Sequence, residues 1–266
     1  MTDWLATCRA AVVDVRAVLE ELPSRAEREP VVGVGLGGDD TTAIDAAAER
    51  VIVERLEATG ESFQLVSEEL GEKTVGKGGS WWVVVDPIDG SVNAKRGIPF
   101  FALSIAVAEG PEMGDVVFGY VYDFGSGEEW TATNGKGAQL NGEELGDQRP
   151  KNAFEILSLE ATRTPFVAET SPKLVELARR VRIMGSLALS LCHLAAGRVD
   201  GVCSLKNARA VDIAAAQLLV RERGLAIDLP AARPFDAAPL DTKGRSRVVA
   251  AATPALCEEL FAAIGP

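Results

Sequence analysis

The chain has 266 residues, of which 47% are hydrophobic and 25% charged, values that are ordinary for a globular protein with a sizeable core. Asp and Glu total 39 against 27 Lys and Arg, and the resulting net charge of −12 argues against a general nucleic-acid or membrane surface. An anionic small substrate is not excluded, because bound cations can reverse the local field.

Cysteine usage and the N-terminal residues exclude further classes. The four cysteines are scattered among apolar residues, no CxxC motif occurs, and His193 is the single histidine, so we expect reduced thiols and no structural zinc site. Charges interrupt the apolar positions of the N-terminal segment, and no apolar run approaches a membrane span. We therefore expect a cytoplasmic protein without nucleic-acid or membrane partners.

The chain begins with two predicted helices. Apolar residues at helical spacing predict an amphipathic helix over residues 3–22, and a second helix is expected over 42–59. Between them, the stretch 33–40 (GVGLGGDD) predicts a flexible loop. It resembles a nucleotide-binding loop only superficially, because no Walker lysine follows it and no strand–GxGxxG–helix context is clear.

Strands then dominate up to a polar segment at 147–152, which we expect to separate residues 1–152 from residues 153–266. Turns at 135–137 and 141–142 bracket a further short strand, as in an antiparallel meander. The main predicted strands of this half are 63–66, 81–85, 101–107, 116–122 and 129–133.

The second half alternates strands and helices, which predicts a mainly parallel, helix-covered sheet. The predicted strands of the second half are 154–159, 182–184, 199–205, 225–228 and 248–251, and its predicted helices are 172–180, 187–196, 211–223 and 254–264. We expect the two halves to pack tightly as one catalytic unit.

The end of the strand at 81–85 is unusual for a buried strand. It leads into Asp86-Pro87-Ile88-Asp89-Gly90-Ser91, where two carboxylates share one turn. Pro87 has no N–H, so we expect it to end the strand ladder. Gly90 permits a close approach of the backbone to a ligand.

Other carboxylates are expected near this turn. Glu68 and Asp86 each follow a predicted strand, so parallel pairing of those strands would place both at one sheet edge, where ligands of α/β proteins bind. Asp212 opens a predicted helix. Taken alone, Glu68-Glu69 could be a solvated turn, and both Asp212 and the Thr42-x-x-Asp45 segment could be helix-capping chemistry.

Several carboxylates in one site repel each other unless a positive charge lies among them. With no histidine or thiolate cluster available, we expect a hard divalent cation, Mg²⁺ first and Mn²⁺ second. The helical segment beginning at Ser91 offers free N–H groups that favour a phosphate. Together these features fit a phosphate ester hydrolase in which a water activated by the metal attacks phosphorus.

This combination resembles the inositol monophosphatase superfamily, and most closely its archaeal-type branch of dual fructose-1,6-bisphosphatases and inositol-1-monophosphatases. The resemblance covers most of the chain. It rests on Thr42-x-x-Asp45, Ser67-Glu68-Glu69, Asp86 to Ser91 with Asn93, the stretch 135–142 (GKGAQLNG), Gly185-Ser186 and Val211-Asp212-x-Ala214-Ala215.

The resemblance implies an α+β fold, a layered α/β/α/β/α sandwich, and a homodimer inhibited by lithium. It also implies that Asp45 and Ser91 orient the attacking water and that Glu69 supports them from behind the ligands. Ser91 replaces a more common threonine and keeps the hydroxyl. The implied Mg²⁺ ligands are Glu68, Asp86, the carbonyl of Ile88, Asp89 and Asp212.

The substrate is expected to be a phosphorylated sugar or polyol, with fructose 1,6-bisphosphate and inositol 1-phosphate as first candidates. Leu205 stands where animal-type inositol monophosphatases place a glutamate that binds inositol, which weakens a dedicated inositol specificity. Three basic residues are candidates for a second phosphate or the leaving group, although each could be a solvated surface charge. The expected substrate-binding residues are Asp89, Gly90, Ser91, Arg182, Gly185, Ser186, Leu187, Lys206 and Arg209.

Two alternatives remain open. A sister branch of the superfamily contains nucleotidases for 3′-phosphoadenosine 5′-phosphate, although the sequence shows no dedicated adenine-binding feature. A non-catalytic binding or scaffold protein that retains the fold is the other, although a competent residue fills every expected ligand position.

Overall fold

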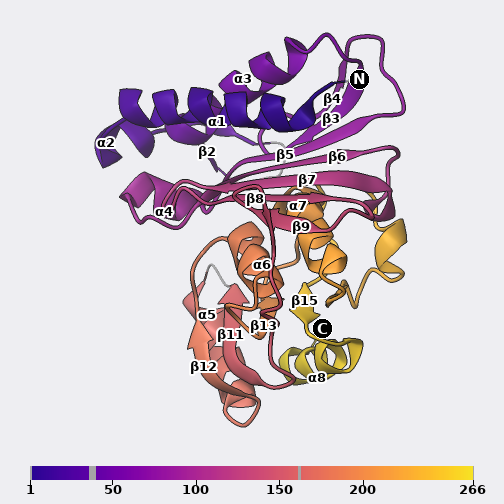
Figure 1. Ribbon diagram of the computed structural model, residues 1–266. Coiled ribbons are helices and arrows are strands. Elements are labelled where there is room, and N and C mark those ends of the chain that lie inside the picture. Colours follow the sequence, from indigo (N-terminus) through magenta and orange to yellow (C-terminus); the bar gives the residue numbers. More distant parts are fainter. Residues whose placement is uncertain (1, 36–39, 161–162, 266) are drawn as a thin grey trace.

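The structure, a computed structural model, describes residues 2–35, 40–160 and 163–265. Its layers follow one another from top to bottom of Figure 1 and confirm the predicted α/β/α/β/α fold class. They are helices α1 (Trp4–Glu21) and α3 (Ala43–Glu57), a large sheet, helices α6 (Leu187–Ala195) and α7 (Ala210–Glu222), a second sheet, and helix α8 (Pro254–Ile264).

The large sheet contains, within the described residues, eight strands in the order β10-β9-β8-β7-β6-β5-β3-β4. Neighbours from β5 to β10 are antiparallel, which confirms the predicted meander. β3 instead runs parallel to β5, with Ser67 opposite Val85. The strands are β3 (Phe63–Ser67), β4 (Gly71–Val75), β5 (Trp82–Asp89), β6 (Ala102–Ala108), β7 (Val116–Asp123), β8 (Glu129–Thr133), β9 (Ala138–Leu140) and β10 (Glu143–Glu144).

The second sheet has the order β12-β11-β13-β15-β14 in the described part of the chain. Only β12, β11 and β13 are parallel, whereas β15 is antiparallel to both β13 and β14. The expectation of a mainly parallel sheet is therefore wrong for its second half. The strands are β11 (Phe154–Glu160), β12 (Ala178–Arg182), β13 (Gly201–Ser204), β14 (Ala226–Asp228) and β15 (Val249–Ala251).

Shorter elements connect these layers. β1 (Val31–Val34) pairs with β2 (Asp40–Thr42), so part of the expected loop 33–40 is strand, while residues 36–39 lie outside the described residues. The other short elements are α2 (Arg25–Arg28), α4 (Ser91–Arg96), α5 (Thr164–Thr170) and the 3₁₀ turns η1 (Met113–Asp115), η2 (Ser171–Leu174) and η3 (Phe235–Ala237).

Local predictions are wrong in two segments, and tertiary pairing explains both. The expected helix over 172–180 and the expected strand over 182–184 are replaced by η2 and by β12, whose residues pair with β11. Pro87 does not end its strand: β5 continues to Asp89, and its ladder with β6 shifts register between Asp86 and Asp89. A proline is tolerated at such an irregularity because its missing N–H interrupts no regular bond.

Alternate side chains of the large sheet enter two different cores, as the pleat requires. Val83 and Val85 pack in the cluster with α1 and α3, whereas Val84 packs in the cluster with α6 and α7. On β7, Gly119 lies against α7 so closely that a Cβ atom would come within 2.4 Å of the Ala215 carbonyl oxygen. Glycine thus lets the backbone of α7 approach the sheet directly.

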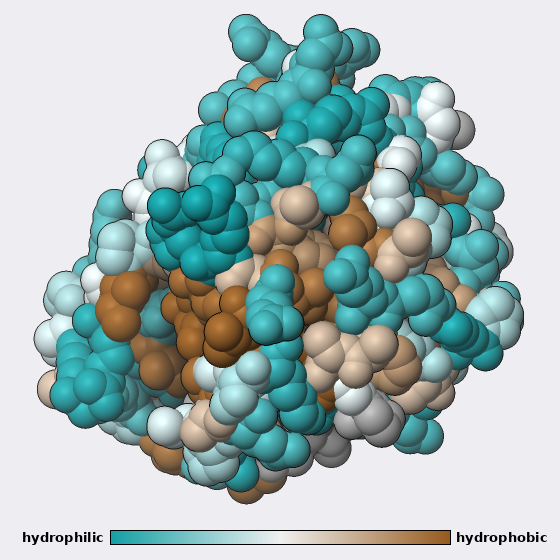
Figure 2. Space-filling model, turned by 90° about the horizontal axis from the view of Figure 1, so that it is seen from below, coloured by the Kyte–Doolittle hydropathy of each residue, from teal (hydrophilic) through white to brown (hydrophobic). Residues whose placement is uncertain are grey.

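The end of the molecule formed by the second sheet carries exposed apolar side chains. Figure 2 shows this end with a hydrophobic area inside a largely hydrophilic surface. Apolar residues exposed on α5, η2 and β12 and beside them are Phe166, Val175, Val181 and Ile183. Among the helices of the described residues, none combines the length and the apolar character needed to cross a membrane.

Candidate active site

The site lies at the edge of the large sheet where β3 and β5 end side by side. Glu68 directly follows β3, and Asp86 lies in the last part of β5. The parallel pairing that this expectation required is present, with Ser67 opposite Val85. Successive residues of both strands therefore bring the two carboxylates to the same edge.

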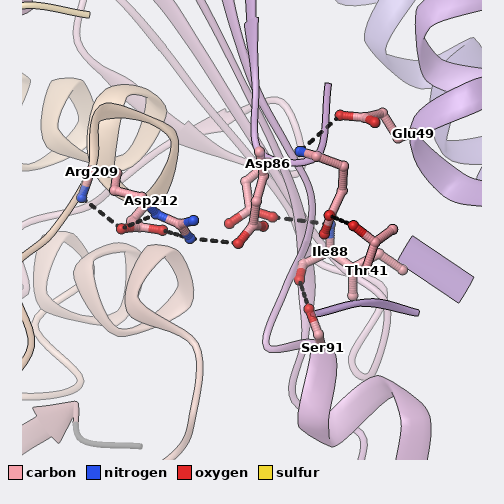
Figure 3. A network of polar contacts seen from close by, with 9 residues as sticks. Thr41, Glu49, Asp86, Ile88, Ser91, Arg209 and Asp212 are labelled. Atoms are coloured by element: carbon pink, nitrogen blue, oxygen red, sulfur yellow. Dashed lines mark hydrogen bonds and ion pairs between the residues drawn. The ribbon is translucent and has the colours of Figure 1, made fainter. Parts of the chain in front are cut away.

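The turn after Asp86 is held by its own polar groups. The backbone N–H of Ile88 donates a 3.1 Å hydrogen bond to Asp86 Oδ1, and Ser91 Oγ donates a 3.0 Å bond to the Ile88 carbonyl oxygen (Figure 3). Gly90 has φ of 96° and is the N-cap residue directly before α4. A Cβ on it would lie 3.0 Å from the Gly185 carbonyl oxygen, so this position requires glycine on two counts.

Asp89 connects this turn to α6. Its Oδ2 atom accepts hydrogen bonds from Ser186 Oγ at 2.5 Å and from the Ala188 backbone N–H at 2.7 Å. Ser186 also caps α6, because its Oγ accepts a 3.2 Å bond from the Leu189 N–H. The expected substrate-binding segment around Ser186 is thus a structural partner of Asp89 in this structure.

Asp212 enters the same region from the start of α7. Its Oδ2 accepts a 2.7 Å bond from the Arg209 backbone N–H, and its Oδ1 accepts a 2.9 Å bond from Arg209 Nη2. The same Nη2 atom donates a 2.5 Å bond to Glu68 Oε1. Only 8% of the Arg209 side chain is exposed, so the alternative that this arginine is a solvated surface charge is wrong.

A second group of acids lies beside β2 and α3. Asp45 Oδ2 accepts hydrogen bonds from the backbone N–H of Thr42, at 3.3 Å, and from its hydroxyl. This is the capping interaction that was one reading of the motif. Asp45 Oδ1, however, is buried without a hydrogen-bond partner. The Thr41 hydroxyl donates to Glu69 (Figure 3).

Two buried glutamates that support the site were missed by sequence reasoning. Glu49 Oε1 accepts from the Ser67 hydroxyl and from the backbone N–H groups of Glu69 and Leu70, at 3.2 and 3.1 Å. Its spacing of four residues from Asp45 puts both on one helix face, which was the available signal.

Glu160 is the other missed residue. Its oxygens accept a 2.9 Å bond from the Gly185 N–H and a 2.6 Å bond from Ser190 Oγ. Glu160 ends the apolar strand β11 much as Glu68 follows β3, and that position was the signal.

Burial and mutual repulsion dominate the electrostatics of the site. Burial raises the pKa of Asp86 well above its ordinary value, and the charges of Glu68 and Asp89 raise it further. Burial also raises the pKa of Asp89 to about 7, although the hydrogen bond from Ser186 lowers it. The pKa of Glu68 is raised because burial outweighs the attraction of Arg209.

Arg209 and Glu69 respond to the same environment. Burial alone would lower the pKa of Arg209, but the charges of Asp212 and Glu68 outweigh burial and raise this pKa. Burial raises the pKa of Glu69 to about 7, and neighbouring carboxylates add to this effect although the Thr41 hydrogen bond opposes it. The site therefore favours added positive charge.

The donor chemistry fits a hard divalent cation, since it consists of oxygen atoms only. The partnerless Asp45 Oδ1 adds an unsatisfied acceptor on a carboxylate whose charge acts on Glu69. The carboxylates are nevertheless not arranged as a finished cage: in the described part of the chain, no group of three or more His, Cys, Asp or Glu side chains is placed so that it could hold a metal ion.

The remaining predicted substrate residues occupy varied positions. Gly185 and Leu187 flank Ser186 at the start of α6. Arg182 is exposed at the end of the edge strand β12 and donates to the Val181 carbonyl oxygen at 3.0 Å. Lys206 is exposed after β13, and its carbonyl oxygen accepts a 2.8 Å bond from Ser204 Oγ. Their roles toward a substrate stay predictions.

The sequence matches the inositol monophosphatase family over residues 6–264. The chain belongs to this family, and it is a phosphatase. The resemblance inferred from the motifs, including its archaeal-type branch, is thereby confirmed.

Three similar proteins illustrate the relationship. The fructose-1,6-bisphosphatase/inositol-1-monophosphatase of Thermococcus kodakarensis is 36% identical, over 88% of this chain and 86% of its own. A solved inositol monophosphatase-fructose 1,6 bisphosphatase has a TM-score of 0.84 and 27% identity, over 98% of this chain and 100% of its own. The Nus factor SuhB of Salmonella typhimurium is 38% identical over 70% of each chain.

Proposed function

We propose that this phosphatase is a Mg²⁺-dependent phosphomonoester hydrolase that acts on sugar or inositol phosphates. Fructose 1,6-bisphosphate and inositol 1-phosphate are the first candidate substrates. The observation that carries the proposal is the convergence of Glu68 and Asp86, from adjacent parallel strands, with Asp212 from α7. The names of the archaeal relatives support the substrate class.

The protein's own groups divide the work in this proposal. The carboxylates of Glu68, Asp86, Asp89 and Asp212 and the Ile88 carbonyl oxygen would hold the cation, Mg²⁺ or in its place Mn²⁺. When bound, such a cation lowers the pKa of water and stabilises charge on phosphate oxygens.

Proton handling and substrate binding fall to other groups. Asp45 Oδ1, buried and without a partner, is available to accept a proton from the attacking water, and the Ser91 hydroxyl helps to orient it. Glu69 supports Asp45 and does not itself ligate the cation. Gly90 and Ser91 lie at the start of α4, where backbone N–H groups can bind phosphate oxygens. Arg182 and Lys206 are proposed to bind a second phosphate or the leaving group.

We also propose that residues 1–152 and 153–266 act as one catalytic unit in a cytoplasmic homodimer inhibited by lithium. Two bonds across the boundary support the single unit, from Arg209 to Glu68 and from Ser186 to Asp89. Sedimentation of the purified protein and turnover in the presence of LiCl test the dimer and the inhibition.

Phosphate release from a panel of phosphate esters tests the proposal. We expect turnover with Mg²⁺ or Mn²⁺, loss of turnover in EDTA, and almost no turnover by a folded Asp86→Asn variant. Asp236→Asn, which removes an exposed partner of Arg221, is the matched control and should keep full activity. Turnover that survives EDTA, or full activity of Asp86→Asn, contradicts the proposal.

Experiments on the same purified protein also test two other functions. Preferential turnover of 3′-phosphoadenosine 5′-phosphate in the panel would indicate the nucleotidase alternative. The similarity to proteins named Nus factor SuhB favours a binding role as a second candidate. Partner binding without turnover of any ester would support a purely non-catalytic protein, and robust turnover would exclude it.

A further inference from the structure

Arg209 occupies the oxygen atoms that the proposed cation needs. Its Nη2 atom bridges Glu68 Oε1, at 2.5 Å, and Asp212 Oδ1, at 2.9 Å. In Figure 3 its guanidinium lies between the Asp212 carboxylate and the acids at the sheet edge. The two acids belong to different layers and are 144 positions apart, since Arg209 is 141 positions from Glu68 and 3 from Asp212.

The guanidinium neutralises the charge of these carboxylates, as a metal cation would. Buried carboxylates of like charge need a positive neighbour, and an arginine fork provides both charge and directed hydrogen bonds. A divalent cation bound to the same two oxygen atoms lies close to the guanidinium and repels it. The two cations therefore compete for Glu68 Oε1 and Asp212 Oδ1.

The Arg209 guanidinium can move away while both acids keep their positions. The Arg209 backbone N–H donates to Asp212 Oδ2 at 2.7 Å, independently of the guanidinium. Asp212 thus keeps its position at the start of α7 when the guanidinium moves away. Glu68, which follows β3 in a loop held by Glu49 through backbone N–H groups, keeps its backbone position as well.

We propose that the Arg209 guanidinium competes with the divalent cation for Glu68 and Asp212 and thereby sets the metal affinity of the site. This inference rests on the metal dependence put forward in the proposed function. The affinity observed for a metal is the intrinsic affinity reduced by the fraction of molecules in which Arg209 has released the two acids. Removing the guanidinium should therefore tighten metal binding, although it removes a counter-charge from buried acids.

Calorimetric titration of the EDTA-treated protein with MgCl₂ or MnCl₂ alone tests this competition. We expect Arg209→Gln to bind Mn²⁺ at least about 10-fold more tightly than the wild type. Arg209→Lys, which keeps the charge without the fork, should fall between them. Arg198→Gln is the matched control, because Arg198 makes a two-bond pair with Glu128 elsewhere and its loss should leave the metal affinity unchanged.

Thermal unfolding separates competition from a merely structural role. Competition predicts that Arg209→Gln melts below the wild type in EDTA and regains most of the difference in saturating Mn²⁺. A structural role predicts the same loss with and without metal. If Arg209→Gln does not fold, the Nε–H NMR signal of Arg209, identified by its absence from the Arg209→Lys spectrum, should still shift in the wild type when Mg²⁺ is added.

The outcomes are distinct for the two proposals. Equal or weaker metal binding by both Arg209 variants, with turnover intact in the wild type, overturns the competition and leaves the proposed function standing. An Arg209 Nε–H signal that does not move at saturating Mg²⁺ also overturns it. Absence of metal binding by every variant and the wild type overturns both the competition and the metal dependence.

Discussion

Ser186 Oγ donates a 2.5 Å hydrogen bond to Asp89 Oδ2 across 97 positions of the chain. Ser186 belongs to the start of α6, under the large sheet, whereas Asp89 ends β5 within it. The Ala188 N–H donates to the same oxygen at 2.7 Å. One oxygen of Asp89 is therefore fixed by α6.

We predict that Ser186→Ala lowers activity or metal affinity by about 10- to 100-fold, as is typical when a partner of a metal ligand is removed. The change also removes the cap of α6, at a cost of about 1 kcal/mol. Thr253→Ala controls for this cost, because Thr253 caps α8 by accepting from the Leu256 N–H at 3.3 Å. Equal activity of the two variants would show that Ser186 acts only as a cap.

Glu49 holds the loop that presents Glu68. We predict that Glu49→Gln lowers metal affinity about 10-fold, because the neutral amide accepts more weakly from the N–H groups of Glu69 and Leu70. Glu54→Gln, on the same helix in an exposed pair with Arg50, is the matched control. Calorimetry with Mn²⁺ measures both, and unchanged affinity in Glu49→Gln would contradict the positioning role.

Asp45 is expected to accept the proton of the attacking water. Asp45→Asn should reduce kcat by about 100-fold or more while the helix keeps its cap, since asparagine also accepts from backbone N–H groups. Asp3→Asn is the control, because Asp3 caps α1 by accepting from the Ala6 N–H at 3.0 Å. A folded Asp45→Asn protein with wild-type kcat would remove Asp45 from the mechanism.

His193 gives a pH prediction that a single NMR signal can test, because the chain has one histidine. Burial lowers its pKa below the ordinary 6.5, and the nearby Arg198 guanidinium lowers it further. The unfolded chain then binds a proton more readily than the folded protein. The contribution of neutral His193 to stability is therefore present above pH 6.5 and is lost as pH falls from there through the folded pKa.

The measurement is the titration of the imidazole C–H signal in a protein without a histidine tag. We expect a pKa below 6.5 in the wild type and a higher pKa in Arg198→Gln. The ring packs against Phe100 and Trp130, with centroids 5.6 and 6.0 Å away. An ordinary pKa in the wild type would mean that this packing does not exclude water.

Much of the fold follows from local patterns. The last helix has the predicted limits, Pro254–Ile264, because Thr253 caps it and Gly265 follows it. β8 likewise spans the predicted residues, Glu129–Thr133. β4 was missed because its sequence, GEKTV, forms an edge strand that is exposed in the middle and carries little apolar signal.

The site was less predictable than the fold. Motif order indicated Glu68, Asp86, Asp89 and Asp212, but their roles as ligands stay predictions. The contact between Arg209 and Glu68 joins residues 141 positions apart, and no local pattern specifies which acid a basic side chain meets. The same holds for Glu160, whose partners Gly185 and Ser190 come from a later part of the chain.

Gly119 determines how closely α7 approaches strand β7 of the large sheet. It is remote in sequence from every proposed ligand. Because Gly119 has no Cβ atom, the Ala215 carbonyl oxygen of α7 lies closer to β7 than a side chain at this position would permit. Asp212 is carried on that helix, three positions before Ala215. The separation between Glu68 and Asp212 therefore depends on the glycine at position 119. A homologue with alanine at this position would need a wider or tilted active site.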